Sequence, residues 1–422
     1  MLISEELRQK LIKNTYSREL KITIGDNVVI NSSNIILDSL EIDSSLMDSE
    51  TLVFGGCISS RMTVKVIDVA NIITSSLEGL TIKVYVIQDY SSDPLYPNAD
   101  LYPDTAVYPG RVSHRLEQVI YTGYFQSIER QKQRNVFEIL AYDEIYRMYQ
   151  TKCKEIIRGY LDYGETQINT LYKLIRVTLK RYDDVYETHL LSQINSSSNR
   201  NIEFQYNYAN NLAADLNLSK NLFAKANDNL SVVDVLAAHS ELNARFAYIN
   251  AEGRLSFAVF YDVVEGSTVQ RSANVAIDSY NNLFYKDYDT TKIRAVSFPY
   301  NGGDSRYDVD STESTDPRVR YVSDNVITKW STDISSYVSG FIRPMNFILY
   351  AISSYRPYSV RTFGEWWIEP GDVISLGTDD VNYPTLKGFV LTRRIRGDSG
   401  MKVELEAKGS RWLSQNELSY SS

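Results

Sequence analysis

The sequence predicts an α+β fold that is mostly β, with two β regions flanking a mixed α/β region. Alternating apolar and polar residues dominate up to about residue 143, apolar residues at helical spacing follow, and alternation returns from residue 292. We therefore expect domains at residues 1–150, 151–285 and 286–422, a division that suits a chain of 422 residues.

The first region begins with a charged amphipathic segment, residues 1–14, that predicts a helix with Leu7 and Leu11 on one face. Period-two alternation then predicts strands that are each half buried. They are expected at residues 20–24, 62–67, 80–87, 119–128 and 135–142.

A proline-rich stretch, the Tyr-Pro loop (residues 94–110), interrupts this β region. A Tyr-Pro pair recurs in it every six residues, and the three tyrosines are Tyr96, Tyr102 and Tyr108. Because proline lacks a backbone donor and forces its predecessor into an extended conformation, we expect a protruding loop between two strands. Its tyrosines are candidate contacts to a neighbouring subunit, and surface decoration without a partner is the alternative.

Helix and hairpin signals mark the middle region. Asp143 is placed to cap a helix over residues 144–150, and residues 167–182 have helical periodicity. Ser231 followed by Asp234 resembles a capping box at the start of a second helix. Residues 245–260 then predict a hairpin around a turn at residues 250–253.

The last region contains an acidic loop, residues 301–317, that is not expected to pack, and a C-terminal hairpin turning at residues 397–400. In its final strand Met401, Val403, Leu405 and Ala407 are expected to face a core. The opposite face would carry a charged ladder of Lys402, Glu404, Glu406 and Lys408.

Composition narrows the classes of function. A net charge of −9 argues against tight binding to nucleic acid, which requires clustered Lys and Arg. Cys57 and Cys153 are too few for a disulfide framework, and no apolar run is long enough for a membrane span. We therefore expect neither a disulfide scaffold nor membrane insertion.

No catalytic or metal-binding motif is present in the sequence. The three histidines, His114, His189 and His239, lie in different segments without ligand spacing, so structural roles are favoured. A calcium site in the acidic loop lacks the glycine and closing glutamate of an EF-hand. Trp366 and Trp367 fit an aromatic anchor better than a sugar-stacking platform. We expect no enzyme activity and no cofactor.

Three stretches, in order, carry a resemblance to a known family. The first is SETLVFGGCISSRMTVKVID, whose turn contains Phe54, Gly55, Gly56 and Cys57; LEGLTIKVYV follows it. In the second, VIYTGYFQSIERQKQRNVFEILAYDEIYRM, one strand contains Gly123 and the next closes on Ala141, Tyr142 and Asp143. The third is WWIEPGDVISLG, whose turn contains Pro370, Gly371 and Asp372.

Taken together, residues 22–409 resemble the central baseplate hub family of tailed bacteriophages and phage tail-like particles, also called tail-associated or tail tip proteins. The resemblance implies two tail-tube-like β-barrel domains, flanking and joined by mixed α/β domains. Three copies would form a homotrimeric ring of six barrel-like units that joins a hexameric tail tube to the tip. Such a ring would hide edge strands and give DNA a channel.

The same resemblance implies partners and a location. The partners are the tail tube protein, the distal tail protein, the C-terminus of the tape measure protein, and other tip or receptor-binding proteins, with DNA present only in transit. The protein would be made in the bacterial cytoplasm and reside in the virion at the tail tip. Many relatives continue past the hub into a peptidase, glycosidase or receptor-binding extension, but this sequence stops at Ser422, so lytic activity is not carried over.

Two other classes of function stay open at this point. One is an adhesin module that binds host-surface carbohydrate through aromatic and acidic loops, and the other is a cell-wall hydrolase. For the hub, the charged ladder, or the strand face carrying Thr63 and Lys65, is a candidate lining of the channel. A merely solvated face is the alternative.

Overall fold

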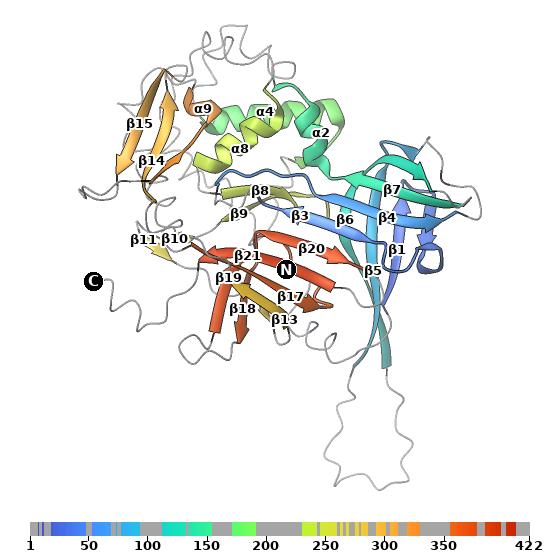
Figure 1. Cartoon of the computed structure of the whole chain (residues 1–422). Coiled ribbons are helices and arrows are strands. Elements are labelled where there is room, and N and C mark those ends of the chain that lie inside the picture. Colours follow the sequence, from blue (N-terminus) through green and yellow to red (C-terminus); the bar gives the residue numbers. More distant parts are fainter. Residues whose placement is uncertain are drawn as a thin grey trace.

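The computed structural model of the chain is mostly β, which confirms the predicted fold class (Figure 1). It describes residues 7, 11, 18–47, 53–68, 73, 77–92, 112–131, 135–153, 171–190, 230–242, 245–259, 262–264, 267–269, 275–277, 280–285, 293–300, 304–310, 319–329, 355–377, 385–397 and 402–410.

One large antiparallel sheet of eleven strands dominates the fold, in the order β13-β17-β21-β20-β3-β4-β7-β6-β5-β1-β2. The N-terminal strands are β1 (Arg18–Ile24), β2 (Val28–Asn31), β3 (Glu41–Ser45), β4 (Arg61–Ile67), β5 (Thr81–Ser92), β6 (Val112–Arg130) and β7 (Val136–Tyr142). The C-terminal strands are β13 (Tyr280–Tyr285), β17 (Tyr355–Phe363), β20 (Thr392–Arg396) and β21 (Lys402–Ser410). Figure 1 shows the blue N-terminal strands beside the red C-terminal ones.

The two β regions meet where β3 pairs with β20, from Thr392 opposite Ser45 to Arg396 opposite Glu41. We call this pairing the internal joint. Among the described strands, no pairing closes the sheet into a barrel. The large sheet is therefore continuous across regions that are far apart in the sequence.

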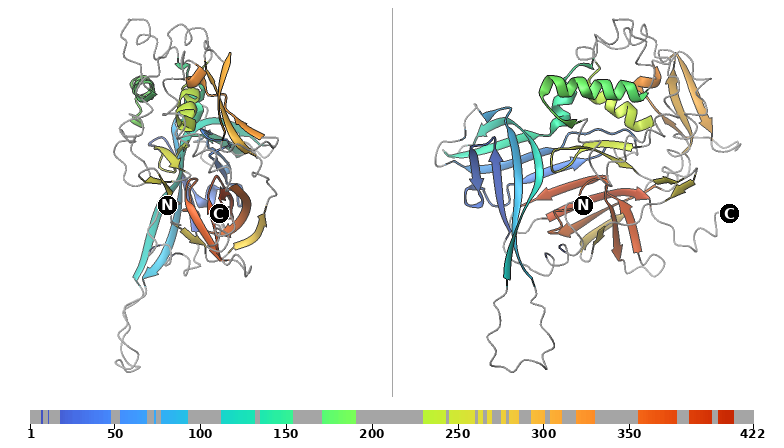
Figure 2. Two further views of the ribbon diagram at one scale, coloured as in Figure 1. Left: turned by 90° about the vertical axis from the view of Figure 1, so that its left-hand side faces the viewer. Right: turned by 180° about the vertical axis from the view of Figure 1, so that it is seen from behind.

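Within the described ranges, four smaller sheets and a group of helices accompany the large sheet. The sheets are β8 (Arg245–Ile249) with β9 (Leu255–Val259); β10 (Asp262–Val264) with β11 (Ser267–Val269); β12 (Val275–Ile277), β18 (Val373–Gly377) and β19 (Thr385–Phe389); and β15 (Ser305–Asp310), β14 (Ile293–Tyr300) and β16 (Val319–Val322). The helical segments are α2 (Glu144–Gln150), α4 (Leu171–Tyr186), α8 (Val232–Leu242), α9 (Val326–Lys329) and the 3-10 turn η1 (Ser32–Asn34). Figure 2 shows the helices at one end of the molecule and the long β5–β6 ribbon extending toward the other.

Local sequence patterns account for most of these elements. In β4 the apolar residues Met62, Val64 and Val66 are fully buried and their neighbours are not, which is the predicted alternation. At α8, Ser231 N donates to Asp234 Oδ2 at 2.7 Å, and Asp234 N donates to Ser231 Oγ at 3.2 Å. The predicted capping box is therefore confirmed.

Buried apolar residues in the described part of the chain form two hydrophobic cores. One lies within the large sheet and combines N-terminal residues such as Ile42 and Val64 with C-terminal ones such as Ile395 and Leu405. The other joins α2, α4 and α8 to the β8–β9 hairpin and also takes in Phe54 from the first β region. Each core is thus built from segments that the predicted domain boundaries separate.

Five strands of the N-terminal region have counterparts in the C-terminal region, in the same chain order and with the same neighbours. β3, β4, β5 and β7 correspond to β13, β17, β18 and β21, and β6 corresponds to β19 followed by β20. We call β1–β7 the N-terminal β unit, and β12, β13 and β17–β21 the C-terminal β unit. β1 is antiparallel to β5 whereas β12 is parallel to β18, so the correspondence ends there.

Matching hydrogen bonds support this correspondence. Gly79, before β5, donates from its N to Phe125 O at 2.7 Å, and Phe125 N donates to Leu80 O at 2.9 Å. Both Gly79 (φ 82°) and Gly371 (φ 88°) are left-handed, a conformation that favours glycine. The counterpart bonds before β18 run from Gly371 N to Val390 O and from Val390 N to Asp372 O, each 2.8 Å.

Two predictions about the C-terminal half need correction. Part of the acidic loop forms strand β15, which pairs with β14, so that stretch does pack. The predicted strand before the last turn is two strands, β19 and β20, which pair in different sheets. Strands β12 and β13, which precede residue 286, pair with β18 and β17.

Some predictions fall outside the described residues. These are the Tyr-Pro loop with Tyr96, Tyr102 and Tyr108, most of residues 1–14, and the side chains of the charged ladder on β21. β5 and β6 are paired as far as Ser92 opposite Val112, so the loop does connect two neighbouring strands. Val403 and Leu405 are fully buried, as predicted.

Candidate functional site

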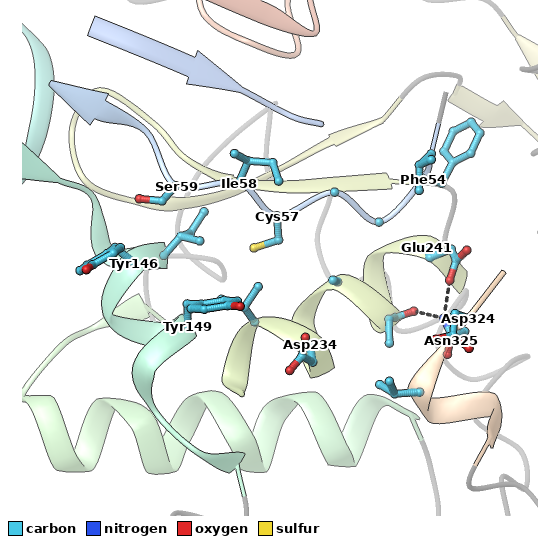
Figure 3. A pocket seen from close by; sticks show the side chains of 18 residues that line it. Phe54, Cys57, Ile58, Ser59, Tyr146, Tyr149, Asp234, Glu241, Asp324 and Asn325 are labelled. Carbon is cyan, nitrogen blue, oxygen red and sulfur yellow. Dashed lines mark hydrogen bonds between the residues drawn. The ribbon is translucent and has the colours of Figure 1, made fainter. Parts of the chain in front are cut away.

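The first predicted motif lies in an extended segment, residues 53–60, that runs along β8 (Figure 3). Gly55 N donates to Arg245 O at 2.9 Å, and Ala247 N donates to Gly56 O at 3.1 Å. A Cβ on Gly55 would lie 2.4 Å from Ala237 O in α8. The glycine pair therefore lets the backbone pass between the hairpin and α8, as the sequence predicted.

A groove of about 550 Å³ follows this segment. Figure 3 shows it between residues 53–59, α2 and α8, with Cys57, Tyr146 and Tyr149 on its walls. Cys57 is buried and burial raises the pKa of its thiol. A buried thiol of raised pKa is a poor nucleophile, so Cys57 has a packing role here.

At one end of the groove, the buried carboxyl group of Glu241 ties α8 to the segment after β16. It accepts hydrogen bonds from Tyr321 Oη at 2.8 Å, Ser323 Oγ at 2.9 Å and Asn325 Nδ2 at 2.8 Å. Tyr321 Oη in turn accepts from Phe54 N at 3.2 Å. Burial raises the pKa of Glu241 and the three hydrogen bonds lower it, the burial being the larger effect.

Asp143 joins the first two motifs. Its side chain accepts from Ser60 N and Ser59 Oγ, each at 2.8 Å, and from Ile145 N at 3.1 Å at the start of α2. The capping role is the predicted one. Burial raises its pKa to about 7 against the lowering effect of these hydrogen bonds.

The remaining residues of the second motif pack the same region. Ala141 is fully buried in β7, and the Tyr142 ring stacks on Tyr146 with centroids 4.4 Å apart. A Cβ on Gly123 would lie 2.4 Å from Tyr121 Oη. The two N-terminal motifs thus converge where the N-terminal β unit meets α2.

The third motif lies at the internal joint instead. Pro370 is buried in the turn of this motif, and Asp372 Oδ2 accepts a hydrogen bond from Glu369 N at 2.9 Å. Glu369 Oε1 accepts from Ala251 N, in the turn of the β8–β9 hairpin, at 3.0 Å. A Cβ on Gly371 would lie 2.7 Å from Ala258 Cβ, so this turn sits tightly against the hairpin.

Arg393 of β20 links this turn to the N-terminal β unit. Its Nη1 donates to Ile368 O at 3.0 Å, and its Nη2 lies 3.4 Å from both Ser44 Oγ in β3 and Ile120 O in β6. Burial lowers the pKa of the guanidinium, whereas the carboxylates of Glu369 and Asp372 raise it. One buried cation therefore holds three segments together.

Ion pairs line the opposite, more exposed face of the internal joint. Arg394 Nε lies 2.6 Å from Asp43 Oδ1, and Arg396 Nη2 lies 2.9 Å from Glu41 Oε1. Lys65 of β4 pairs with Glu138 of β7 at 3.9 Å. In these three pairs each cation lies within 3.9 Å of a carboxylate, so the pairs add no net charge to the described part of this face.

The three histidines lie in separate segments, and the tryptophan pair is buried. His114 stacks on Tyr90, His189 is exposed after α4, and His239 is buried in α8. Burial, with a smaller effect of Arg245, lowers the pKa of His239 to about 3. Trp366 and Trp367 are 0% and 1% exposed, so they cannot act as a platform for sugars.

Within the described ranges, no group of three or more His, Cys, Asp or Glu side chains could hold a metal ion. No helix in those ranges is long and apolar enough to span a membrane. What the motifs bring together is two joints between segments: the groove region around residues 53–60 and the internal joint.

No protein-family model and no curated protein sequence matches the chain. Among solved structures, the tail protein from Neisseria meningitidis MC58 is similar over 93% of this chain and 97% of that one, with a TM-score of 0.52 and 12% sequence identity. The chain has a tail-protein fold.

Two prophage proteins are similar to this tail-protein fold at lower scores. The 43 kDa tail protein of prophage MuSo2 from Shewanella oneidensis matches over 93% of this chain and 99% of its own, with a TM-score of 0.48 and 10% identity. Prophage tail protein gp18 from Listeria monocytogenes EGD-e matches over 92% and 94%, with a TM-score of 0.42 and 11% identity. The predicted resemblance to phage tail proteins is confirmed at the level of the fold.

Proposed function

We propose that the protein is a structural hub at the tip of a phage or phage-like tail, where three copies form a ring. The observation that carries this proposal is the correspondence between its two β units, in strand order and in the turns at Gly79 and Gly371. Three chains with two similar units each present six units around one axis, which matches a sixfold tube on one side and threefold neighbours on the other.

In this proposal the internal joint fixes the angle between successive units. Arg393 and the two arginine–carboxylate pairs connect β3 to β20 on both faces of the sheet. We start the C-terminal β unit at β12. We place the mixed α/β region between the two β units. Each β unit would act as a tail-tube-like element, with the helices and the β8–β9 hairpin as braces.

The partners and location follow from the same proposal. The ring would contact the tail tube, the distal tail protein, the tape measure protein and other tip or receptor-binding proteins, and DNA would pass through it. The paired charges on the exposed face of the joint suit a lining that neither holds nor strongly repels DNA. The role is structural and not enzymatic.

The test is the oligomeric state of the purified chain. Light scattering should give a mass three times that of one chain, and negative-stain images should show a ring with a central opening. Purified tails labelled on this chain should carry the label at the end of the tube. A stable monomer at all concentrations, or label at the periphery of the tail with glycan binding, would overturn the proposal in favour of an adhesin.

A further inference from the structure

The groove shown in Figure 3 is fixed at each end by a buried carboxyl group. At one end Asp143 accepts hydrogen bonds from Ser59 Oγ at 2.8 Å and from Ile145 N at 3.1 Å, so it ties that wall of the groove to α2. At the other end Glu241 of α8 accepts from Asn325 Nδ2 at 2.8 Å, which ties α8 to the start of α9. Both contacts lie within one chain, so the shape of the groove is set before a partner binds.

The lining of the groove is mostly apolar and contains acids but no bases. Its 18 lining residues all belong to the described part of the chain, and they include three carboxylic acids and no Lys, Arg or His. Figure 3 shows Tyr146 and Tyr149 toward one end, and Glu241 and Asp324 toward the other. The groove therefore has an aromatic end and an acidic end.

Two large apolar side chains of the lining are exposed to solvent. Tyr149 is 64% exposed and Val53 is 43% exposed. Tyrosine is enriched in protein–protein interfaces, where its ring packs and its hydroxyl group hydrogen-bonds. A groove continued by exposed apolar side chains offers more surface than a small molecule covers, which favours a protein segment as the occupant.

Asp324 supplies the accessible charge at the acidic end. Its side chain is 84% exposed and pairs with Lys329. Exposed ion pairs of this kind contribute little to stability, so an incoming Lys or Arg competes with a weak contact. The carboxyl group of Glu241 is buried and already accepts three hydrogen bonds, so the wall of the groove stays intact when a cation binds at Asp324.

We propose that the groove binds an amphipathic helical segment of a partner protein, with apolar side chains at the aromatic end and a Lys or Arg at the acidic end. A helix satisfies its own backbone hydrogen bonds, whereas an extended peptide would bury unpaired backbone groups in an apolar groove. An apolar helix face seated in a groove is a common mode of recognition. The opposite charges at the acidic end orient the segment and select the partner.

A different protein fits the groove better than a second copy of this chain. Each copy has a net charge of −9, so two copies repel each other, whereas a basic segment is attracted. Because all the lining residues come from one chain, the inference does not rest on the proposed ring. One segment should bind per chain, in a monomer and in a trimer alike.

Fluorescence anisotropy with model peptides tests the chemistry of the occupant. The probe is a fluorescein-labelled peptide of Leu and Lys, with its leucines on one helix face at positions i, i+3, i+4 and i+7. Two matched peptides replace every Lys by Glu or every Leu by Ser. The full chain should bind the Leu–Lys peptide about tenfold more tightly than either matched peptide. Equal binding of either matched peptide would overturn the inference, since charge or apolar surface alone would then suffice.

Two exposed positions test where the peptide binds. Tyr149→Ala should weaken binding of the Leu–Lys peptide about tenfold, because it removes the exposed aromatic ring. Asp324→Asn should weaken it about threefold, because it removes the accessible charge. Both side chains are exposed, so both variants should keep the circular dichroism spectrum of the parent chain.

The chain offers a matched control for each variant. Leu37→Ala removes an apolar side chain that is 65% exposed and lies between η1 and β3. Asp184→Asn removes an acid of α4 that is 52% exposed and pairs with Arg181, much as Asp324 pairs with Lys329. Both controls should bind the Leu–Lys peptide as tightly as the parent chain.

The results separate this inference from the proposed function. Unchanged binding in both groove variants, or an equal loss in the controls, places the peptide elsewhere and overturns the inference. A trimer that fails to bind the Leu–Lys peptide contradicts the inference and leaves the ring intact. A monomer that binds it with the expected effects of Tyr149→Ala and Asp324→Asn supports the inference and contradicts the ring.

Discussion

Replacing Arg393 with methionine should destabilise the protein more than any other single arginine change on β20. Methionine keeps most of the apolar stem, so the loss comes from the guanidinium and not from a cavity. The donor at 3.0 Å to Ile368 O is lost, and the buried carboxylates of Glu369 and Asp372 lose their nearby cation. Removing one partner of a buried ionic group costs about 3–5 kcal/mol, and we expect a decrease of that size.

The assay is urea unfolding at neutral pH, followed by tryptophan fluorescence. Trp366 and Trp367 are buried in the core of the large sheet and precede the turn that Arg393 holds, so their emission reports on the joint. The matched control is Arg394→Met, on the next residue of the same strand. Arg394 is 40% exposed and pairs with Asp43 on the other face, so its loss should cost less than about 1 kcal/mol.

A second variant tests the electrostatic part of this reasoning. Adding Glu369→Gln to Arg393→Met removes one uncompensated carboxylate, while the amide oxygen can still accept from Ala251 N. Part of the lost stability should return. The reasoning is refuted if Arg393→Met costs no more than Arg394→Met, or if the added Glu369→Gln deepens the loss.

Four other positions give three separate predictions. Gly79→Ala should lower the free energy of unfolding by about 1–2 kcal/mol, because only its left-handed backbone is strained. Gly371→Ala should lower the thermal midpoint further, because its Cβ would also meet a neighbouring atom at 2.7 Å. Equal decreases in the thermal midpoint of the two variants would contradict this. Ser231→Ala should cost about 1 kcal/mol and speed amide exchange at the start of α8; unchanged exchange there would argue against the capping box. The pKa of Asp143 is raised to about 7, so the folded state holds its proton more tightly than the unfolded state and stability falls as pH rises from about 4 to about 7. Asp143→Asn should flatten that fall in urea midpoints, and an unchanged slope would assign it to other groups.

Local sequence patterns were enough to predict the elements that depend on contacts between residues close in the sequence. The alternation around Val64 predicted β4, the spacing of Ser231 and Asp234 predicted the start of α8, and Asp143 predicted the start of α2. Each of these depends on contacts within a few residues. The glycine pair at Gly55 was likewise recognisable because close backbone approach requires glycine.

The joints could not be predicted in the same way. The pair of Arg394 and Asp43 is separated by 351 residues, and no local pattern says which edge strand meets which. The burial of Arg393 could have been predicted. It lies two residues from both Leu391 and Ile395, which are buried, so the period-two alternation of a strand places it on the same buried face. Strand β15 also had an alternating pattern, which its acidic composition obscured.

The internal joint has a consequence for how the chain is made. A ribosome adds about 5–20 residues per second, so β3 emerges and then waits on the order of twenty seconds to a minute before β20, its partner 351 residues later, exists. Throughout that delay the edge of β3 in the nascent chain is unpaired, and it could pair with a strand of a neighbouring copy that is being translated from the same messenger RNA. Slow translation, or a lack of chaperones that mask extended segments, should therefore lower the yield of usable protein without altering any finished contact.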